Sequence, residues 1–264
     1  LVEIKLTGMG EPLMAGDQMF DMIAYARARH IWVRSVTNAS LLHLKDNYRK
    51  IIDSGINELQ VSVDGADKEV FETIRGGSKF EKVVENCRLL NAYCKDVGQT
   101  RAKMWTVVQK DNVHQLFELV ELAEYMGFTS QVFSLDLTNW GQDDWQSRNE
   151  AKNLVSHIDL ETGWRLVEDG KRRGINVSFW NIAAKYDTAA PEQLCPWPFE
   201  RAYVSSDSRV VPCCMIANPD VLEIAPIKNG FSEVWLGNDY REFRRAHIEG
   251  NIPPACQNCY RAGA

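Results

Sequence analysis

The chain has 264 residues, of which 45% are hydrophobic and 25% are charged. This is the balance of a globular protein, and the length allows one large domain plus a smaller one, or a single α/β barrel. A formal net charge of −6 gives no basic surface for a nucleic-acid backbone. No apolar run is long enough to cross a bilayer and no signal peptide is visible, so we expect a cytoplasmic protein without nucleic-acid or membrane partners.

Strand-like and helix-like segments alternate from the first residue, which is typical of βα units and a mainly parallel sheet. The expected strands are residues 1–7, 30–37, 57–63, 102–109 and 130–135, with a further apolar run at 175–180. The expected helices are residues 17–29, 40–54, 69–74, 80–94, 113–126 and 160–173. Leu1 opens directly into a strand, so the sequence looks truncated, and one more βα unit before it would bring the five countable units to six.

The regular alternation ends after residue 135. A polar stretch at residues 138–151 is expected to form a rim or linker, and the proline-rich segment PEQLCPWPF marks the start of a different region. We therefore predict a partial barrel over residues 1–190 and a second, smaller domain over residues 191–264.

The loop after the first expected strand reads TGMGEPLM. Its glycines allow a ligand to approach the backbone, the Glu11 carboxylate can pair with an ammonium group, and Pro12 fixes the turn. Sites in α/β folds lie at this end of the strands. The alternative is an ordinary tight turn, which is a common use of glycine and proline.

Polar residues also end the next two expected strands. Thr37 and Asn38 close one of them, and Ser62 and Asp64 lie two residues apart at the end of the other, where both face the same side. Because three successive strands bring polar groups to one edge, these residues are candidates for ligand binding. The alternative is that Asp64 forms a turn and Asp67 caps the following helix.

Cysteine usage points to a metal in the last part of the chain. Cys256 and Cys259 form a C-x2-C pair, and Cys195 with Cys213 or Cys214 lies upstream. Four thiolates suffice for a tetrahedral zinc or for an iron–sulfur cluster, and spacing alone does not separate the two. An odd total of seven cysteines also argues against a disulfide scaffold.

The other two cysteines have a different character. Cys87 and Cys94 lie seven residues apart on the expected helix 80–94, on one apolar face with Leu90. We expect both to be small buried hydrophobic residues.

Taken together, the GMGEP loop, the TN and SVDG strand ends, the FETIRGG segment and the cysteine tail resemble the radical S-adenosylmethionine (SAM) superfamily, in its SPASM/twitch branch. The resemblance covers essentially the whole chain, and the segments CPWPF, VVPCC, VWLGNDYREFR and CQNC are its most specific part. It implies an α/β fold: a partial (β/α)6 barrel that lacks its first strand and cluster loop, followed by a small iron–sulfur domain.

The resemblance also implies a set of site residues. Those matching the SAM-binding positions are Met9, Gly10, Glu11, Thr37, Asn38, Ser62, Asp64 and Arg75, with Met9 in place of the family's usual glycine. Those matching the ligands of an auxiliary [4Fe-4S] cluster are Cys195, Cys213, Cys256 and Cys259. Cys213 is preferred over Cys214 because the family places this ligand five residues after a turn glycine, a position that Ser208 occupies here.

The family's C-x3-C-x2-C motif for the catalytic cluster does not occur in these residues and is expected upstream of Leu1. A second [4Fe-4S] cluster is therefore expected from that segment, and the given chain alone is expected to be inactive. The resemblance implies a 5′-deoxyadenosyl radical that abstracts hydrogen from a small polar substrate, as in sugar or cyclitol dehydrogenation or epimerisation, or from a peptide. A flavodoxin or ferredoxin is the expected electron donor.

Two alternatives remain open. The chain could be a non-catalytic homologue that binds SAM or a partner, or a binding protein whose tail holds a structural zinc. Metal analysis after anaerobic preparation separates iron from zinc.

Overall fold

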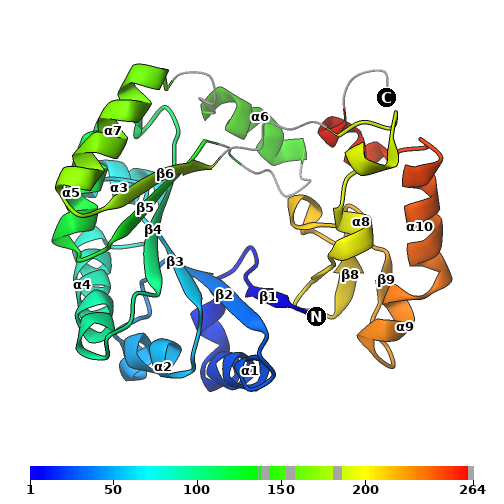
Figure 1. Cartoon of the computed structure of the whole chain (residues 1–264), viewed down its shortest axis with the longest axis horizontal. Coiled ribbons are helices and arrows are strands. Elements are labelled where there is room, and N and C mark those ends of the chain that lie inside the picture. The colour runs from blue at the N-terminus through cyan, green and yellow to red at the C-terminus, as the bar shows by residue number, and fades with distance from the viewer. Residues whose placement is uncertain (136, 138–142, 153–157, 181–185, 261–264) are drawn as a thin grey trace. The chain divides into compact units, whose positions relative to one another are not determined.

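The computed structural model describes residues 1–135, 137, 143–152, 158–180 and 186–260 (Figure 1). The chain divides into two compact units, one made of Leu1–Leu137 with Lys152–Asn181 and the other of Thr138–Ala151 with Ile182–Ala264. It therefore passes between the units three times. The domain boundary between residues 190 and 191 stays a prediction, because compactness does not by itself define an independently folding domain.

The first unit is built on a six-stranded sheet in which every neighbouring pair is parallel and the strands lie in sequence order. The strands are β1 (Glu3–Leu6), β2 (Trp32–Thr37), β3 (Glu58–Ser62), β4 (Ala102–Val107), β5 (Ser130–Ser134) and β6 (Asn176–Trp180). Each lies within two residues, at either end, of a segment predicted from the sequence. Their carboxyl ends therefore form one edge of the sheet, as a site at that edge requires.

Helices of the first unit cover one face of this curved sheet (Figure 1). They are α1 (Asp17–Arg27), α2 (Asn47–Asp53), α3 (Lys68–Ile74), α4 (Phe80–Asp96), α5 (Leu116–Tyr125) and α7 (Leu160–Arg172). On α4 the buried stripe contains Cys87, Leu90 and Cys94, which confirms that both cysteines are core residues. Burial raises the pKa of the Cys87 thiol far above its usual range.

Two helices differ from the sequence expectation. The helix expected over residues 40–54 is reduced to α2, because Lys45 and Asp46 have φ angles of 48° and 58° and interrupt it. Before that break, the Asn38 side chain accepts hydrogen bonds from the amide and hydroxyl of Ser40, at 2.9 and 2.6 Å, and closes a local turn. The polar stretch at residues 138–151 was expected to be a rim or linker, but its second half belongs to helix α6 (Asp143–Lys152).

The second unit has much shorter elements. A three-stranded antiparallel sheet has the order β7 (Tyr203–Val204), β8 (Arg209–Val211) and β9 (Ala225–Pro226). Its helices after residue 190 are α8 (Trp197–Glu200), α9 (Phe231–Trp235) and α10 (Asn238–Ile248). In the hydrophobic cluster of this unit Val210, Val234 and Tyr240 are buried.

The predicted fold class, a parallel α/β sheet followed by a small C-terminal domain, is confirmed. Within the described residues, no helix combines the length and the hydrophobicity that crossing a membrane requires.

Candidate functional site

Glu11 lies near the carboxyl end of β1 and hydrogen-bonds residues at the carboxyl end of β2. It follows β1 and caps the short 3-10 helix Pro12–Ala15, where its Oε1 accepts from the Leu13 amide at 3.2 Å. The same oxygen accepts from the Thr37 hydroxyl at 2.8 Å, and Oε2 accepts from the Asn38 amide at 2.7 Å. Because an ionised carboxylate has about four acceptor positions, Glu11 keeps capacity for a further donor.

The residues around Glu11 support its placement. Thr37 is buried, and its hydroxyl oxygen also accepts from the Ala39 amide at 3.0 Å, so the Thr37 side chain has a fixed orientation. Met9 is exposed, and a Cβ placed on Gly10 would meet no atom within 4 Å. The loop thus leaves space beside Gly10, and the Glu11 carboxylate together with this space fits the amino group of a bound SAM molecule in chemistry and in room.

Asp64 occupies the end of the third strand and is almost completely buried. Its Oδ2 accepts from Nε and Nη2 of Arg75, both at 2.6 Å, and its Oδ1 accepts from the Val107 amide at 2.8 Å. The charge is therefore paired and hydrogen-bonded, as a buried carboxylate must be. Arg75 was expected among the SAM-binding residues, which stays a prediction; within the chain its partner is Asp64.

The turn after Asp64 also has the local role that was weighed as the alternative. Asp67 caps α3 by accepting from the Val70 amide at 2.9 Å. Gly65 allows close packing, since a Cβ there would lie 2.4 Å from the Phe71 amide nitrogen. Ser62, on β3, lies in register with Trp105 of β4 and is largely buried. The segment therefore has the structural role of a turn, and a ligand-binding role for the strand end that precedes it stays a prediction.

The sequence analysis missed Asn112, which anchors this strand end. It is fully buried, and its Nδ2 donates to the carbonyls of Asp64 and Val107, both at 2.9 Å. Its Oδ1 accepts from the Gln109 amide at 2.8 Å. In the sequence, Asn112 follows the strand that pairs with β3, and this position could have marked it as a residue near the end of β3.

The predicted cluster ligands all lie in turns and short helices of the second unit. Cys195 lies two residues before the start of α8, and Cys213 is the N-cap of the 3-10 helix Cys214–Ile216. Cys256 and Cys259 lie on the 3-10 helix Pro254–Cys259. Short turns of this kind expose backbone amides, which can donate to sulfur.

Amide donors do reach two of these sulfurs. The Trp197 amide donates to Cys195, and the amides of Met215 and Ile216 donate to Cys213. Hydrogen bonds of this kind favour a negatively charged thiolate or cluster.

The thiols also influence one another. Burial, together with nearby cysteines, raises the pKa of Cys213 and of Cys256 to about 12; these neighbours are Cys214 and Cys256 for the former and Cys259 and Cys195 for the latter. In the part of the chain that the structure describes, no three side chains form a closed metal-ligand group. In kind and number, though not as a closed group, the four cysteines fit the ligands of an iron–sulfur cluster.

Ser208 has the backbone conformation of the glycine that it replaces. Its φ is 63°, in the left-handed region, and it lies in the turn between β7 and β8. This conformation agrees with the register in which Cys213, five residues later, is the ligand, although the choice between Cys213 and Cys214 stays a prediction.

Comparison with family models gives two matches. The radical SAM superfamily model matches residues 2–123, and the SPASM model, an iron–sulfur cluster-binding domain, matches residues 195–260. These domains imply SAM and iron–sulfur clusters as cofactors, as predicted from the sequence.

Similar curated proteins include the mycofactocin maturase MftC of Mycolicibacterium smegmatis, which is 33% identical over 256 residues that cover 96% of this chain and 62% of the maturase. The mycofactocin maturase MftC of Mycobacterium ulcerans is 30% identical, over 96% of this chain and 66% of that protein. The chain thus spans less than two thirds of the length of these relatives.

Solved structures share the fold at low identity. Streptococcus suis SuiB bound to the precursor peptide SuiA has a TM-score of 0.67 at 16% identity, over 92% of this chain and 56% of SuiB. The structure of anSMEcpe with bound AdoMet and the Cp18Cys peptide has a TM-score of 0.60 at 16% identity, over 97% of this chain and 75% of that one. With both domain models matched in order along one chain, and with relatives aligned over nearly all of it, the chain belongs to the radical SAM superfamily, in the branch that carries a SPASM domain.

Proposed function

We propose that the protein containing this chain is a radical SAM enzyme that modifies a peptide, with an auxiliary iron–sulfur cluster in its second unit. The observation that carries the proposal is Glu11, a carboxylate held by the ends of two strands with acceptor capacity to spare. A rim of this kind suits the ammonium group of SAM, and the cysteine unit on the same chain suits a cluster.

In this proposal the residues of the chain bind SAM and hold it in position. Glu11 accepts from the SAM amino group, and the backbone beside Met9 and Gly10 lies against the methionyl part. Ser62 and Asp64 hydrogen-bond the ribose side, while Arg75 and Asn112 keep Asp64 in place. When bound near a reduced cluster, SAM supplies hydrogen-abstraction chemistry.

A peptide is the proposed substrate because of the relatives. The maturases and SuiB, whose structure contains a precursor peptide, align over most of this chain. A small polar molecule is the second candidate, since the structure of BtrN with AdoMet and 2-DOIA shares the fold at a TM-score of 0.51. A flavodoxin or ferredoxin remains the proposed electron donor.

The test is calorimetric titration of SAM into the full-length protein and its Glu11→Gln variant. We expect affinity to fall about ten- to hundred-fold, because the interaction with a charged group is worth about 1.5–3 kcal/mol. Glu85→Gln, an exposed change on α4, is the matched control and should leave affinity unchanged. Equal affinities of the Glu11→Gln variant and the wild type would contradict the assignment.

A further inference from the structure

Three distant segments of the second unit meet at Cys195. The Tyr186 amide donates to the Cys259 carbonyl at 2.9 Å, and this contact is part of an isolated bridge between Tyr186 and Tyr260. The Cys195 amide donates to the Tyr260 hydroxyl oxygen at 3.0 Å. Cys195 and Cys259, two of the proposed ligands, are thus linked through hydrogen bonds of the two tyrosines.

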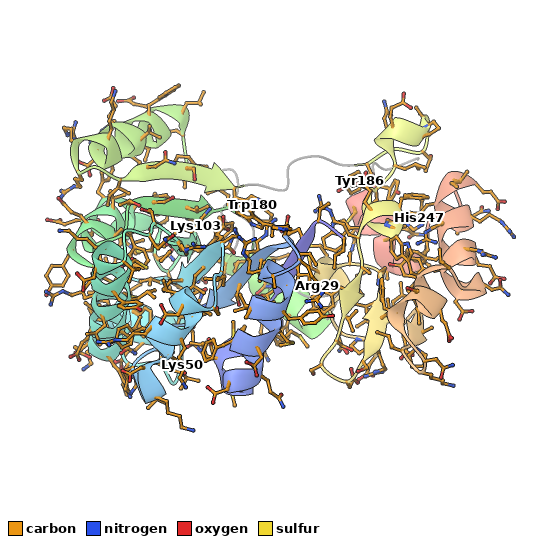
Figure 2. All side chains as sticks on the ribbon, turned by 60° about the horizontal axis from the view of Figure 1, so that its bottom comes forward. Arg29, Lys50, Lys103, Trp180, Tyr186 and His247 are labelled. Carbon is orange, nitrogen blue, oxygen red and sulfur yellow. The ribbon has the colours of Figure 1, made fainter. Side chains whose placement is uncertain are left out.

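The tyrosine side chains are themselves fixed. The rings of Tyr186 and Tyr260 lie 5.8 Å apart, and the ring of the buried His247 lies 6.0 Å from that of Tyr260. His247 in turn hydrogen-bonds the Phe243 carbonyl through Nδ1 at 3.0 Å. Tyr186 and His247 are labelled in Figure 2, on the second unit. Fixed rings hold their hydroxyl groups at fixed positions.

We propose that Tyr186 and Tyr260 are positioning residues of the cysteine site. Tyr260 holds the backbone of Cys195 in register with Cys259, and the Tyr186 ring packs against the Tyr260 ring that carries this hydroxyl. This rests on the proposed iron–sulfur function. The physical reason is that a ligand residue whose position is fixed beforehand loses less conformational freedom when the cluster binds.

The first test uses the 264-residue chain, reconstituted anaerobically with iron and sulfide. Since its residues include no C-x3-C-x2-C motif, the cysteine site is the one expected to bind a cluster. In Tyr186→Ala, which removes the ring that packs against Tyr260, we expect wild-type iron content but release of iron to a chelator about two- to tenfold faster, the effect of losing an aromatic pair.

The second test is Tyr260→Phe, which keeps the ring but removes the acceptor of the Cys195 amide. Because the amide is left without this partner, Cys195 is held less firmly, and we expect release of iron to a chelator to be about tenfold faster or more. Tyr93→Phe is the matched control: it removes an exposed hydroxyl that donates to Asp53 at 2.7 Å and should change neither property.

Unchanged iron release in Tyr186→Ala would overturn the role of the Tyr186 ring, and unchanged iron release in Tyr260→Phe would overturn the role of the Tyr260 hydroxyl. Rings that serve only as hydrophobic packing predict the second of these results. A wild-type chain that binds zinc and no iron would overturn the iron–sulfur site as well, and metal analysis before the chelator experiment identifies that case.

Discussion

The two units hold their candidate sites by different means. In the first, a six-stranded sheet and a large buried core fix the strand ends, and buried hydrogen bonds orient Glu11 and Asp64. In the second, the strands have two or three residues, the buried core is small, and the thiols lie on turns. The comparison indicates that packing shapes the first site before any ligand binds, and we expect a bound metal to contribute to the folding of the second unit.

Removing the metal ligands tests this contrast most severely. Replacing Cys256 and Cys259 together by alanine should abolish iron binding in the anaerobically reconstituted chain, where the wild type should hold about four iron atoms. Because the second unit has little core of its own, residues after Cys195 should also be cleaved faster by a protease.

The matched control for this experiment is Cys87→Ala, which changes a buried cysteine of the first unit and should leave the iron content unchanged. Iron that survives the double substitution would contradict the proposed ligand set. Stoichiometric zinc without iron would favour the non-catalytic alternative with a structural metal.

In the first unit the sharpest disruption should come from backbone packing. Gly65→Ala places a Cβ 2.4 Å from the Phe71 amide nitrogen and 2.6 Å from its Cα, so α3 must move. We expect the free energy of unfolding to fall by about 1–3 kcal/mol. Denaturant unfolding followed by circular dichroism measures it.

Gly76→Ala is the control for Gly65, because a Cβ there meets nothing within 4 Å and its φ is not positive. A loss of stability shared equally by both variants would show that close packing at Gly65 is not the cause.

The smallest expected effect concerns the turn of the second unit. Ser208 has a φ of 63°, which glycine adopts without steric cost, so Ser208→Gly should stabilise the reconstituted chain by about 0.5–1 kcal/mol. Thermal unfolding of the two proteins at equal iron content checks this.

Ser205→Ala should act in the opposite direction. Its hydroxyl donates to Asp207 Oδ1 or to the Arg209 carbonyl, which lies 2.9 Å away, and accepts from the Arg209 amide at 3.1 Å, so the change removes the side-chain hydrogen bonds of Ser205 in the same turn. If Ser208→Gly also lowers the melting temperature, the left-handed backbone is not a source of strain there.

Local patterns were sufficient to predict most of the first unit. The strands are runs of alternating or continuous apolar residues that end at glycine or at a pair of polar residues, so their ends could be predicted from the sequence. The parallel order of the strands then places Glu11, Thr37 and Asp64 at one edge of the sheet. The burial of Cys87 and Cys94 followed from helical spacing alone.

The contacts that the sequence could not reveal are those between distant residues. Asn112 and Asp64 are 48 positions apart, and Tyr260 and Cys195 are 65 apart. Each contact joins one side chain to one backbone group, so it leaves no repeating pattern in the sequence from which it could be predicted. Helix α6 was not predicted for a different reason: a largely polar helix lacks the apolar stripe by which a helix is recognised in a sequence.

The chain crosses between the two units three times, which determines what a single proteolytic cut can separate. A break near residue 181 leaves Thr138–Ala151 attached to the first unit, and a break near residue 137 leaves Lys152–Asn181, with strand β6, attached to the second. No single cut therefore releases either unit whole. Cleavage by a protease at one of these three crossings should yield two fragments that copurify under native conditions and separate only in denaturant.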